Sequence, residues 1–306
     1  MGRDYLSVDD LSADELVHVL DLADRLKADR SLHDRALAGK AIALVFEKAS
    51  TRTRLSFEVG VAELGAHPLT ISSGDLQLGR GETIEDTGRV MSRYVDAIVL
   101  RTFEQERLEV LADAADVPVV NSLSDFEHPC QALADLQTMR ERLGGLRGRV
   151  LTYVGDGNNV AHSLLLGGAK VGMQVRVATP PGFEPIPLVV QRAAEIATET
   201  GGAVAVGNDA KTAADGADVL YTDVWASMGQ EGEADERSLV FPAFRIDAAL
   251  VSLASEEAIV MHCLPAHRGQ EIVDEVIDGP RSAVWDQAEN RLHAQKALLL
   301  FLFGLA

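Results

Sequence analysis

The 306-residue chain has only two cysteines, Cys130 and Cys263, and too few basic residues to balance its acidic ones. Two thiols cannot form the disulfide framework of a secreted protein, so a reduced, cytoplasmic setting is expected. Lysine and arginine number 28 against 47 aspartates and glutamates, which gives a formal net charge of −19. This balance argues against nucleic acid or an anionic membrane surface as a partner, because both attract basic surfaces.

Long hydrophobic runs are also missing. The longest, Ala297 to Phe303, is far shorter than the roughly 20 residues of a membrane span, so it predicts a buried terminal helix. The first residues contain no apolar core of a secretory signal. Hydrophobic residues make up 47% of the chain, which is ordinary for a globular protein, and the length suggests two domains.

Short apolar runs alternate with amphipathic stretches along the whole chain. This alternation predicts an α/β fold of two domains, each with a mainly parallel central sheet flanked by helices. Three glycines between Gly144 and Gly148 mark a break, and the polar stretch from Gln230 to Glu236 predicts an exposed loop. The expected strands are Ala41 to Phe46, Ala97 to Leu100, Val117 to Val120, Val150 to Val154, Gln174 to Ala178, Val219 to Thr222 and Ile259 to His262. The expected helices are Leu55 to Leu64, Leu108 to Ala115, Gln131 to Leu143, Val189 to Thr198 and Glu289 to Leu302.

The first segment that could form a binding site is Ser50-Thr51-Arg52-Thr53-Arg54, which lies between an expected strand and an expected helix. A helix N-terminus presents unpaired N–H groups and a positive dipole end, and arginine donates two parallel hydrogen bonds to a phosphate. The run therefore predicts an anion site. The alternative is a capped helix with solvated arginines.

Two further segments follow. His128-Pro129-Cys130-Gln131 can point an imidazole and an amide at one ligand, or can simply begin a helix with proline at its first position. Gly155-Asp156-Gly157-Asn158-Asn159 resembles half of a dinucleotide fingerprint. Its third glycine is replaced by Val160 and no acidic residue for a ribose follows, so an NAD-dependent oxidoreductase is disfavoured.

The last two segments also follow expected strands. Asp223, at the start of Asp-Val-Trp-Ala-Ser-Met-Gly, could hold a cationic amine or could be a solvated loop acid. His262-Cys263-Leu264-Pro265 offers a nucleophilic thiol or backbone carbonyls. No Cys-x-x-Cys pair is present, so a closed structural zinc site is not expected.

Together, these segments resemble the carbamoyltransferase family, in the same order along nearly the whole chain. Ser-Thr-Arg-Thr-Arg and His-Pro-x-Gln are common to the aspartate and ornithine branches, whereas Asp-x-Trp-x-Ser-Met-Gly and His-Cys-Leu-Pro are similar to the ornithine branch. The resemblance implies transfer of a carbamoyl group from carbamoyl phosphate to the δ-amine of L-ornithine, giving L-citrulline and phosphate for arginine biosynthesis. It implies no cofactor and no metal.

The resemblance also implies an organisation. Residues 1–135 would bind carbamoyl phosphate, residues 136–285 would bind ornithine, and residues 286–306 would form a helix returning to the first domain. The enzyme would be a homotrimer, or a multiple of trimers, with active sites shared between neighbouring subunits.

Site residues are implied one by one. Carbamoyl phosphate would be held by Ser50, Thr51, Arg52, Thr53, Arg101, His128, Gln131, Cys263, Leu264 and Arg291, with Gln77 from an adjacent chain. Ornithine would be held by Asn159, Asp223, Ser227 and Met228. The catalytic groups would be Arg101, His128, Asp223 and Cys263.

The residues fit this chemistry, because a small dianion needs the local arginines and hydroxyls that overcome a repulsive net charge, and a tetrahedral intermediate needs donors for its oxygen. Two alternatives remain open. One is a carbamoyltransferase for another amine, such as putrescine or an acylated ornithine. The other is a relative that binds an anion without catalysis.

Overall fold

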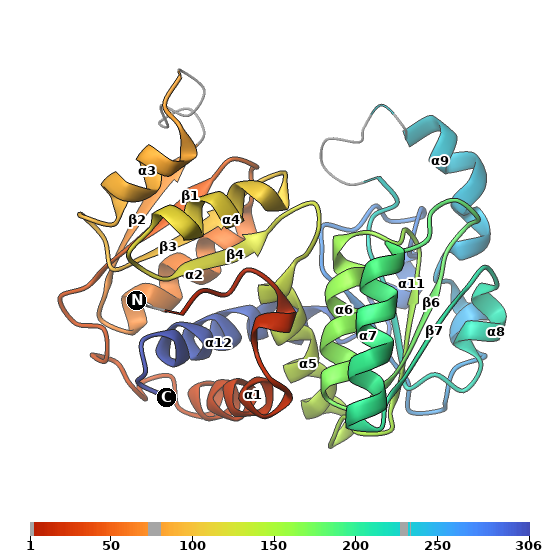
Figure 1. Cartoon of the computed structure of the whole chain (residues 1–306). Coiled ribbons are helices and arrows are strands. Elements are labelled where there is room, and N and C mark those ends of the chain that lie inside the picture. The colour runs from red at the N-terminus through yellow and green to blue at the C-terminus, as the bar shows by residue number, and fades with distance from the viewer. Residues whose placement is uncertain (1–2, 73–80, 227–231, 233) are drawn as a thin grey trace. The chain divides into compact units, whose positions relative to one another are not determined.

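The computed structural model describes residues 3–72, 81–226, 232 and 234–306, and these fall into two compact units (Figure 1). Unit 1 comprises Met1–Ala134 and Glu289–Ala306, and unit 2 comprises Asp135–Ala288. Two helices, α5 (Pro129–Leu143) and α12 (Val284–Leu302), contribute residues to both units. No helix among the described residues is both long and apolar enough to cross a membrane.

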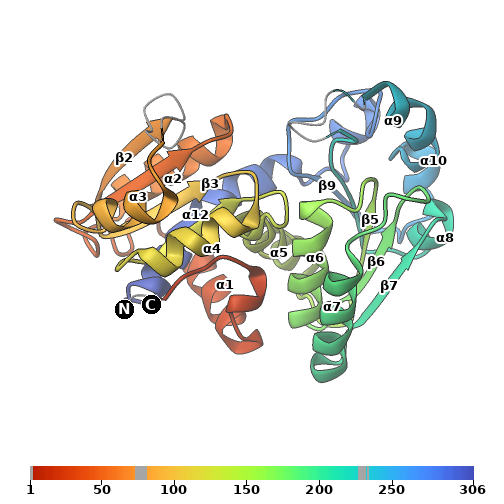
Figure 2. The same ribbon diagram turned by 45° about the horizontal axis from the view of Figure 1, so that its top comes forward.

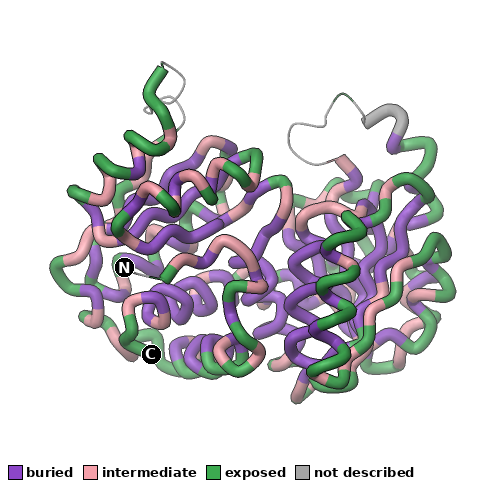
Figure 3. The backbone as a smooth tube through the Cα atoms, in the orientation of Figure 1, coloured by how far each residue is buried: buried purple, intermediate pink, exposed green. Residues whose placement is uncertain are grey.

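Unit 1 is built on a four-stranded parallel sheet in the order β2-β1-β3-β4. The inner strands β1 and β3 are buried almost throughout (Figure 3), which explains their continuous apolar sequences. The strands are β1 (Ala41–Phe46), β2 (His67–Ser72), β3 (Ala97–Arg101) and β4 (Val119–Leu123). The remaining elements are η1 (Val8–Asp10), α1 (Ala13–Ala28), α2 (Thr51–Glu63), α3 (Ile84–Met91) and α4 (Gln105–Ala114).

Unit 2 is built on a five-stranded parallel sheet in the order β7-β6-β5-β8-β9. Helices α6 and α7 pack side by side against one face, and α8 and α10 pack together on the other (Figure 2). The strands are β5 (Val150–Val154), β6 (Gln174–Ala178), β7 (Ala203–Gly207), β8 (Val219–Thr222) and β9 (Ile259–His262). The helices are α6 (Asn159–Lys170), α7 (Pro187–Thr200), α8 (Ala210–Ala214), α9 (Ala234–Val240), η4 (Phe241–Phe244), α10 (Ala248–Val251) and α11 (Asp274–Ile277).

The predicted fold class is confirmed. Both sheets are parallel and flanked by helices, and the C-terminal part of α12 belongs to unit 1. Arg291 and Lys296 of α12 donate hydrogen bonds to Thr53 and Glu63 of α2, so the C-terminal helix does return to unit 1.

Several local predictions were wrong. The strand expected at Val117 to Val120 lies at Val119–Leu123, and the loop expected at Gln230 to Glu236 overlaps α9, which begins at Ala234. The edge strands β2 and β7 were missed. Their residues alternate in exposure and form no apolar run, whereas the other two edge strands, β4 and β9, are buried almost throughout.

Parallel strands place all their carboxyl ends at one edge of each sheet. In unit 1 that edge carries the turns after β1, β3 and β4, and in unit 2 it carries the turns after β5, β8 and β9. Nearly every residue singled out from the sequence lies at one of these two edges.

Candidate active site

The Ser-Thr-Arg-Thr run opens α2 directly after β1. Ser50 is the N-cap, and its Oγ accepts a hydrogen bond of 3.2 Å from the Thr53 amide. Thr51 is exposed, Arg52 is half-buried and Thr53 is buried. The geometry leaves the rest of the first turn's N–H groups and two hydroxyls at the positive end of the helix, which suits a phosphate.

Two buried arginines and two buried polar side chains belong to the same unit as this turn. Arg101 ends β3, and Arg291 of α12 donates from Nη2 to Thr53 Oγ1. Both guanidinium groups are almost fully buried, as are His128 and Gln131 at the start of α5. Burial, with the charges of Arg291 and Arg101 second, holds the pKa of His128 well below its usual value. His128 is therefore neutral near pH 7 and can donate one hydrogen bond to a carbonyl oxygen.

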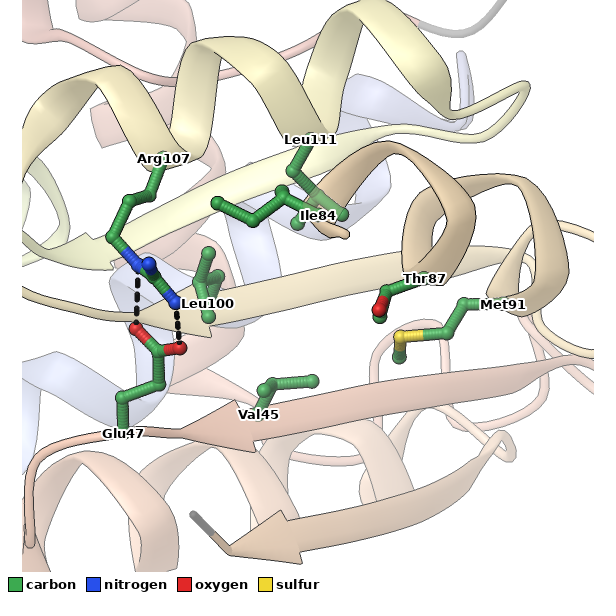
Figure 4. Close-up of a pocket in the computed structure, with 8 residues that line it drawn as sticks. All are labelled: Val45, Glu47, Ile84, Thr87, Met91, Leu100, Arg107 and Leu111. Carbon is green, nitrogen blue, oxygen red and sulfur yellow. Dashed lines mark hydrogen bonds and ion pairs between the residues drawn. The ribbon is translucent and has the colours of Figure 1, made fainter. Parts of the chain in front are cut away.

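Glu47, directly after β1, forms an ion pair with Arg107 of α4, a contact that the sequence did not reveal (Figure 4). Its amide donates to the Arg101 carbonyl at 2.9 Å. Its carboxylate accepts from Arg107 through both oxygens, with Nε at 3.1 Å, and from the Thr102 hydroxyl. Since Ser50 follows three residues later and Thr102 follows Arg101, the bonds of Glu47 connect both segments that carry the predicted phosphate ligands.

Asp223 is the centre of a second cluster, in unit 2. It follows β8, and its neighbours in space follow the adjacent strands β5 and β9. Cys263 Sγ donates to Asp223 Oδ1 at 2.9 Å, and Asn158 Nδ2 donates to Asp223 Oδ2 at 2.9 Å. Asp223 and Cys263 are both buried. The arrangement holds a buried carboxylate beside a thiol, and a carboxylate can bind a cationic amine.

Asn158 makes a contact with Asp223 that the sequence did not predict. It is the N-cap of α6, and its Oδ1 accepts from the Val160 and Ala161 amides at 3.0 and 3.2 Å. Capping fixes the amide so that its Nδ2 faces the carboxylate. Asn159, which was the predicted ligand, is the first residue of α6 and half-buried. An Asn at a strand-to-helix turn is the sequence signal for a cap, and Asn158 is the capping residue.

His262 shapes the His-Cys-Leu-Pro turn. Its Nδ1 accepts from the Leu264 amide at 2.9 Å, so the ring proton lies on Nε2, which donates to Glu271 Oε1 at 3.1 Å. Both residues are fully buried. Leu264 has φ of +58°, a conformation that non-glycine residues rarely adopt. The His262–Glu271 pair therefore holds a strained turn next to Cys263.

Among the described residues, one group lies close enough to share a metal ion, namely Asp223, His262 and Cys263, whose ligand atoms are within 4.8 Å of one another. Hydrogen bonds already engage both oxygens of Asp223 and both ring nitrogens of His262. The His262 ring is therefore held by Leu264 and Glu271, and the Asp223 carboxylate is held by Cys263 and Asn158.

Three predicted ligands, Gln77, Ser227 and Met228, lie outside the described residues. Arg237 of α9 is a buried residue that the sequence did not single out. It donates to Asp156 Oδ2 at 2.8 Å and to the Trp225 carbonyl at 2.6 Å. It thus joins the turn after β5 to the segment after β8.

Two family models match the chain. "Aspartate/ornithine carbamoyltransferase, carbamoyl-P binding domain" covers residues 3–141, and "Aspartate/ornithine carbamoyltransferase, Asp/Orn binding domain" covers residues 147–302. Among curated proteins, the chain is 64% identical to the ornithine carbamoyltransferase of Parafrankia sp. (strain EAN1pec), over 98% of this chain and 96% of that protein. It is 59% identical to the ornithine carbamoyltransferase of Acidothermus cellulolyticus, over 100% of this chain and 98% of that protein.

Solved structures agree with these matches. The ornithine carbamoyltransferase from Pyrococcus furiosus is 53% identical, with a TM-score of 0.96 over 99% of this chain and 97% of that chain. The anabolic ornithine carbamoyltransferase from Campylobacter jejuni is 36% identical, with a TM-score of 0.94 over 99% of this chain and 100% of that chain. The similarity therefore extends over both units and both clusters.

Proposed function

The chain belongs to the aspartate/ornithine carbamoyltransferase family, and on this premise we propose that it transfers the carbamoyl group of carbamoyl phosphate to the δ-amine of L-ornithine, releasing L-citrulline and phosphate. The observation that carries the choice of acceptor is the hydrogen bond between Cys263 and Asp223. It joins the two segments that resemble the ornithine branch, and it places a carboxylate where an amine can be bound.

The phosphate end of the reaction belongs to unit 1. Ser50, Thr51, Arg52 and Thr53 at the start of α2 hold the phosphate together with Arg101, because two guanidinium groups and a helix N-terminus offset the dianion's charge. Local cations are needed here, since the chain as a whole carries a net charge of −19.

The carbamoyl carbonyl is bound by His128, Gln131 and Arg291, with Gln77 of an adjacent subunit. Neutral His128 donates to the carbonyl oxygen, and Arg101 strengthens its contact as negative charge develops on that oxygen. Cys263 and the Leu264 backbone complete this part of the site from the His-Cys-Leu-Pro turn.

The ornithine end belongs to unit 2, where Asp223, Asn159, Ser227 and Met228 bind the amino acid. Asp223 attracts the δ-ammonium and, with Cys263, accepts one of its protons. The neutral nitrogen attacks the carbonyl carbon and a tetrahedral intermediate forms. The nitrogen then gives up a second proton to the departing phosphate as the C–O bond to phosphate breaks. Holding two substrates in line supplies much of the rate.

The assembly and its place in the cell are part of the same proposal. We propose a homotrimer in the cytoplasm, working in arginine biosynthesis. Leu55 and Val59 of α2 and Leu69 of the edge strand β2 are 55%, 42% and 38% exposed, so unit 1 presents apolar side chains that a second copy could cover. Light scattering coupled to gel filtration should give the mass of three 32.8 kDa chains or a multiple of it.

The direct test is citrulline formation from carbamoyl phosphate, with L-ornithine, aspartate, putrescine and N-acetylornithine as parallel acceptors. We expect ornithine to be strongly favoured. Turnover with another acceptor would keep the carbamoyl phosphate site and overturn the ornithine assignment. Absence of turnover with all four would reject the enzyme and leave a protein that binds an anion.

A further inference from the structure

We infer that the segment from Asp4 to Asp10, which precedes α1, is a strap that positions His128 for its contact with the carbamoyl group. The inference rests on the proposed function, because that function makes His128 a catalytic residue. It goes further by assigning a role in the reaction to residues more than a hundred positions away in sequence.

The strap is anchored along β4, the edge strand of unit 1 (red segment in Figure 1). The Tyr5 amide donates to the Val119 carbonyl at 2.9 Å, and the Asn121 amide donates to the Tyr5 carbonyl at 2.8 Å. Tyr5 and Val8 are fully buried. The strap is therefore held in place in unit 1, and its position can determine that of the residues it contacts.

Its far end holds Glu127, the residue directly before His128. Glu127 Oε1 accepts from the Ser7 hydroxyl at 2.5 Å, and Oε2 accepts from the Val8 amide at 3.0 Å. The Glu127 side chain is fully buried, and a buried carboxylate needs such donors. Both of its oxygens accept hydrogen bonds from the strap.

The residue after His128 is held as well. The Tyr5 hydroxyl donates to the Pro129 carbonyl at 3.4 Å, a long bond that adds to the contacts of Glu127. Pro129 begins α5, and its ring fixes the backbone dihedral angle φ at that position. The strap thus contacts the residues on both sides of His128. A displacement of Glu127 should therefore also displace the His128 imidazole.

The loop leading to Glu127 is closed on itself by hydrogen bonds between Ser124 and Glu127. The Ser124 amide donates to the Glu127 carbonyl at 2.8 Å, and the Glu127 amide donates to Ser124 Oγ at 3.1 Å. A loop closed by these bonds moves as a unit. Since misplacement of a catalytic group by about 1 Å can cost 10²-fold in rate, a small loosening at Ser7 should be visible in kcat.

The test compares Ser7→Ala with the matched control Ser12→Ala. Both serines are N-caps in capping boxes of this region, but Ser12 caps α1 and bonds with Glu15, away from Glu127. We expect Ser7→Ala to lower kcat for citrulline formation about tenfold with an unchanged KM for ornithine. Ser7→Thr should restore the rate, and Ser12→Ala should lower Tm while leaving kcat within about twofold. Tyr5→Phe provides a second, milder strap variant.

A second readout separates this inference from the proposed function. The imidazole nitrogen signals of His128 in ¹⁵N-histidine NMR, identified by their loss in His128→Gln, should move in Ser7→Ala and stay in Ser12→Ala. An inactive wild-type enzyme with this NMR response would reject the proposed reaction and retain the strap. Unchanged His128 signals and unchanged kcat in Ser7→Ala, with a lowered Tm, would show that the strap only stabilises the fold and would overturn the inference.

Discussion

His128 should make the stability of this protein depend on pH in a way that one substitution removes. Burial, followed by the charges of Arg291 and Arg101, lowers its pKa well below 6.5 in the folded chain. The unfolded chain then binds one more proton than the folded chain when the pH falls below about 6.5. The contribution is therefore fully present above that pH and is lost as the pH falls.

The magnitude follows from proton linkage. One extra proton on the unfolded chain changes the free energy of unfolding by about 1.4 kcal/mol per pH unit. Integrated from pH 7.5 to 5.5, with the imidazole neutral in the folded chain throughout, the loss is about 1.4 kcal/mol per chain. His128→Gln keeps a polar side chain of similar size and has no titrating group, so it should lack this loss.

The assay is urea unfolding of both proteins at several pH values, in buffers free of phosphate, because a bound anion would itself stabilise the folded state. Other titrating groups contribute equally to both proteins and cancel in the difference. The two curves of unfolding free energy against pH should separate below pH 6.5, the wild type falling more steeply. Parallel curves would refute the assignment of a neutral, buried His128.

Three other substitutions test the two clusters and the return of α12. Asp223→Asn removes the charge that attracts the δ-ammonium, so kcat/KM for ornithine should fall about 10²-fold. The KM for carbamoyl phosphate should stay the same. Steady-state kinetics with each substrate varied in turn measure both values, and an equally large change for carbamoyl phosphate would contradict the role of Asp223 in binding ornithine. Glu47→Gln breaks the ion pair with Arg107 and should weaken carbamoyl phosphate binding about tenfold by calorimetry; unaltered affinity would exclude a positioning role. Lys296 is fully buried and donates to Glu63 at 2.8 Å, so Lys296→Met should cost about 2–3 kcal/mol in urea unfolding, and a cost near zero would mean that the pair adds nothing.

The sequence alone was sufficient to predict the fold class and the segments in which the candidate site residues lie. Buried parallel strands such as β1, β5 and β8 must be apolar along their length, so their runs are visible without coordinates. Polar segments that follow such runs belong at the carboxyl edge of a sheet. This reasoning located the start of α2, the turn after β8 and the turn after β9 correctly.

Only the tertiary structure decided which side chains meet. Thr53 and Arg291 are 238 positions apart, Ser7 and Glu127 are 120 apart, and nothing in their local sequence pairs them. Strand order and helix packing bring them together, and periodicity reports neither. The same holds for the cap role of Asn158, because neighbouring asparagines look alike until one of them is seen to cap a helix. Local sequence encodes which face of an element is buried, whereas contacts across the sheet depend on how whole elements are arranged.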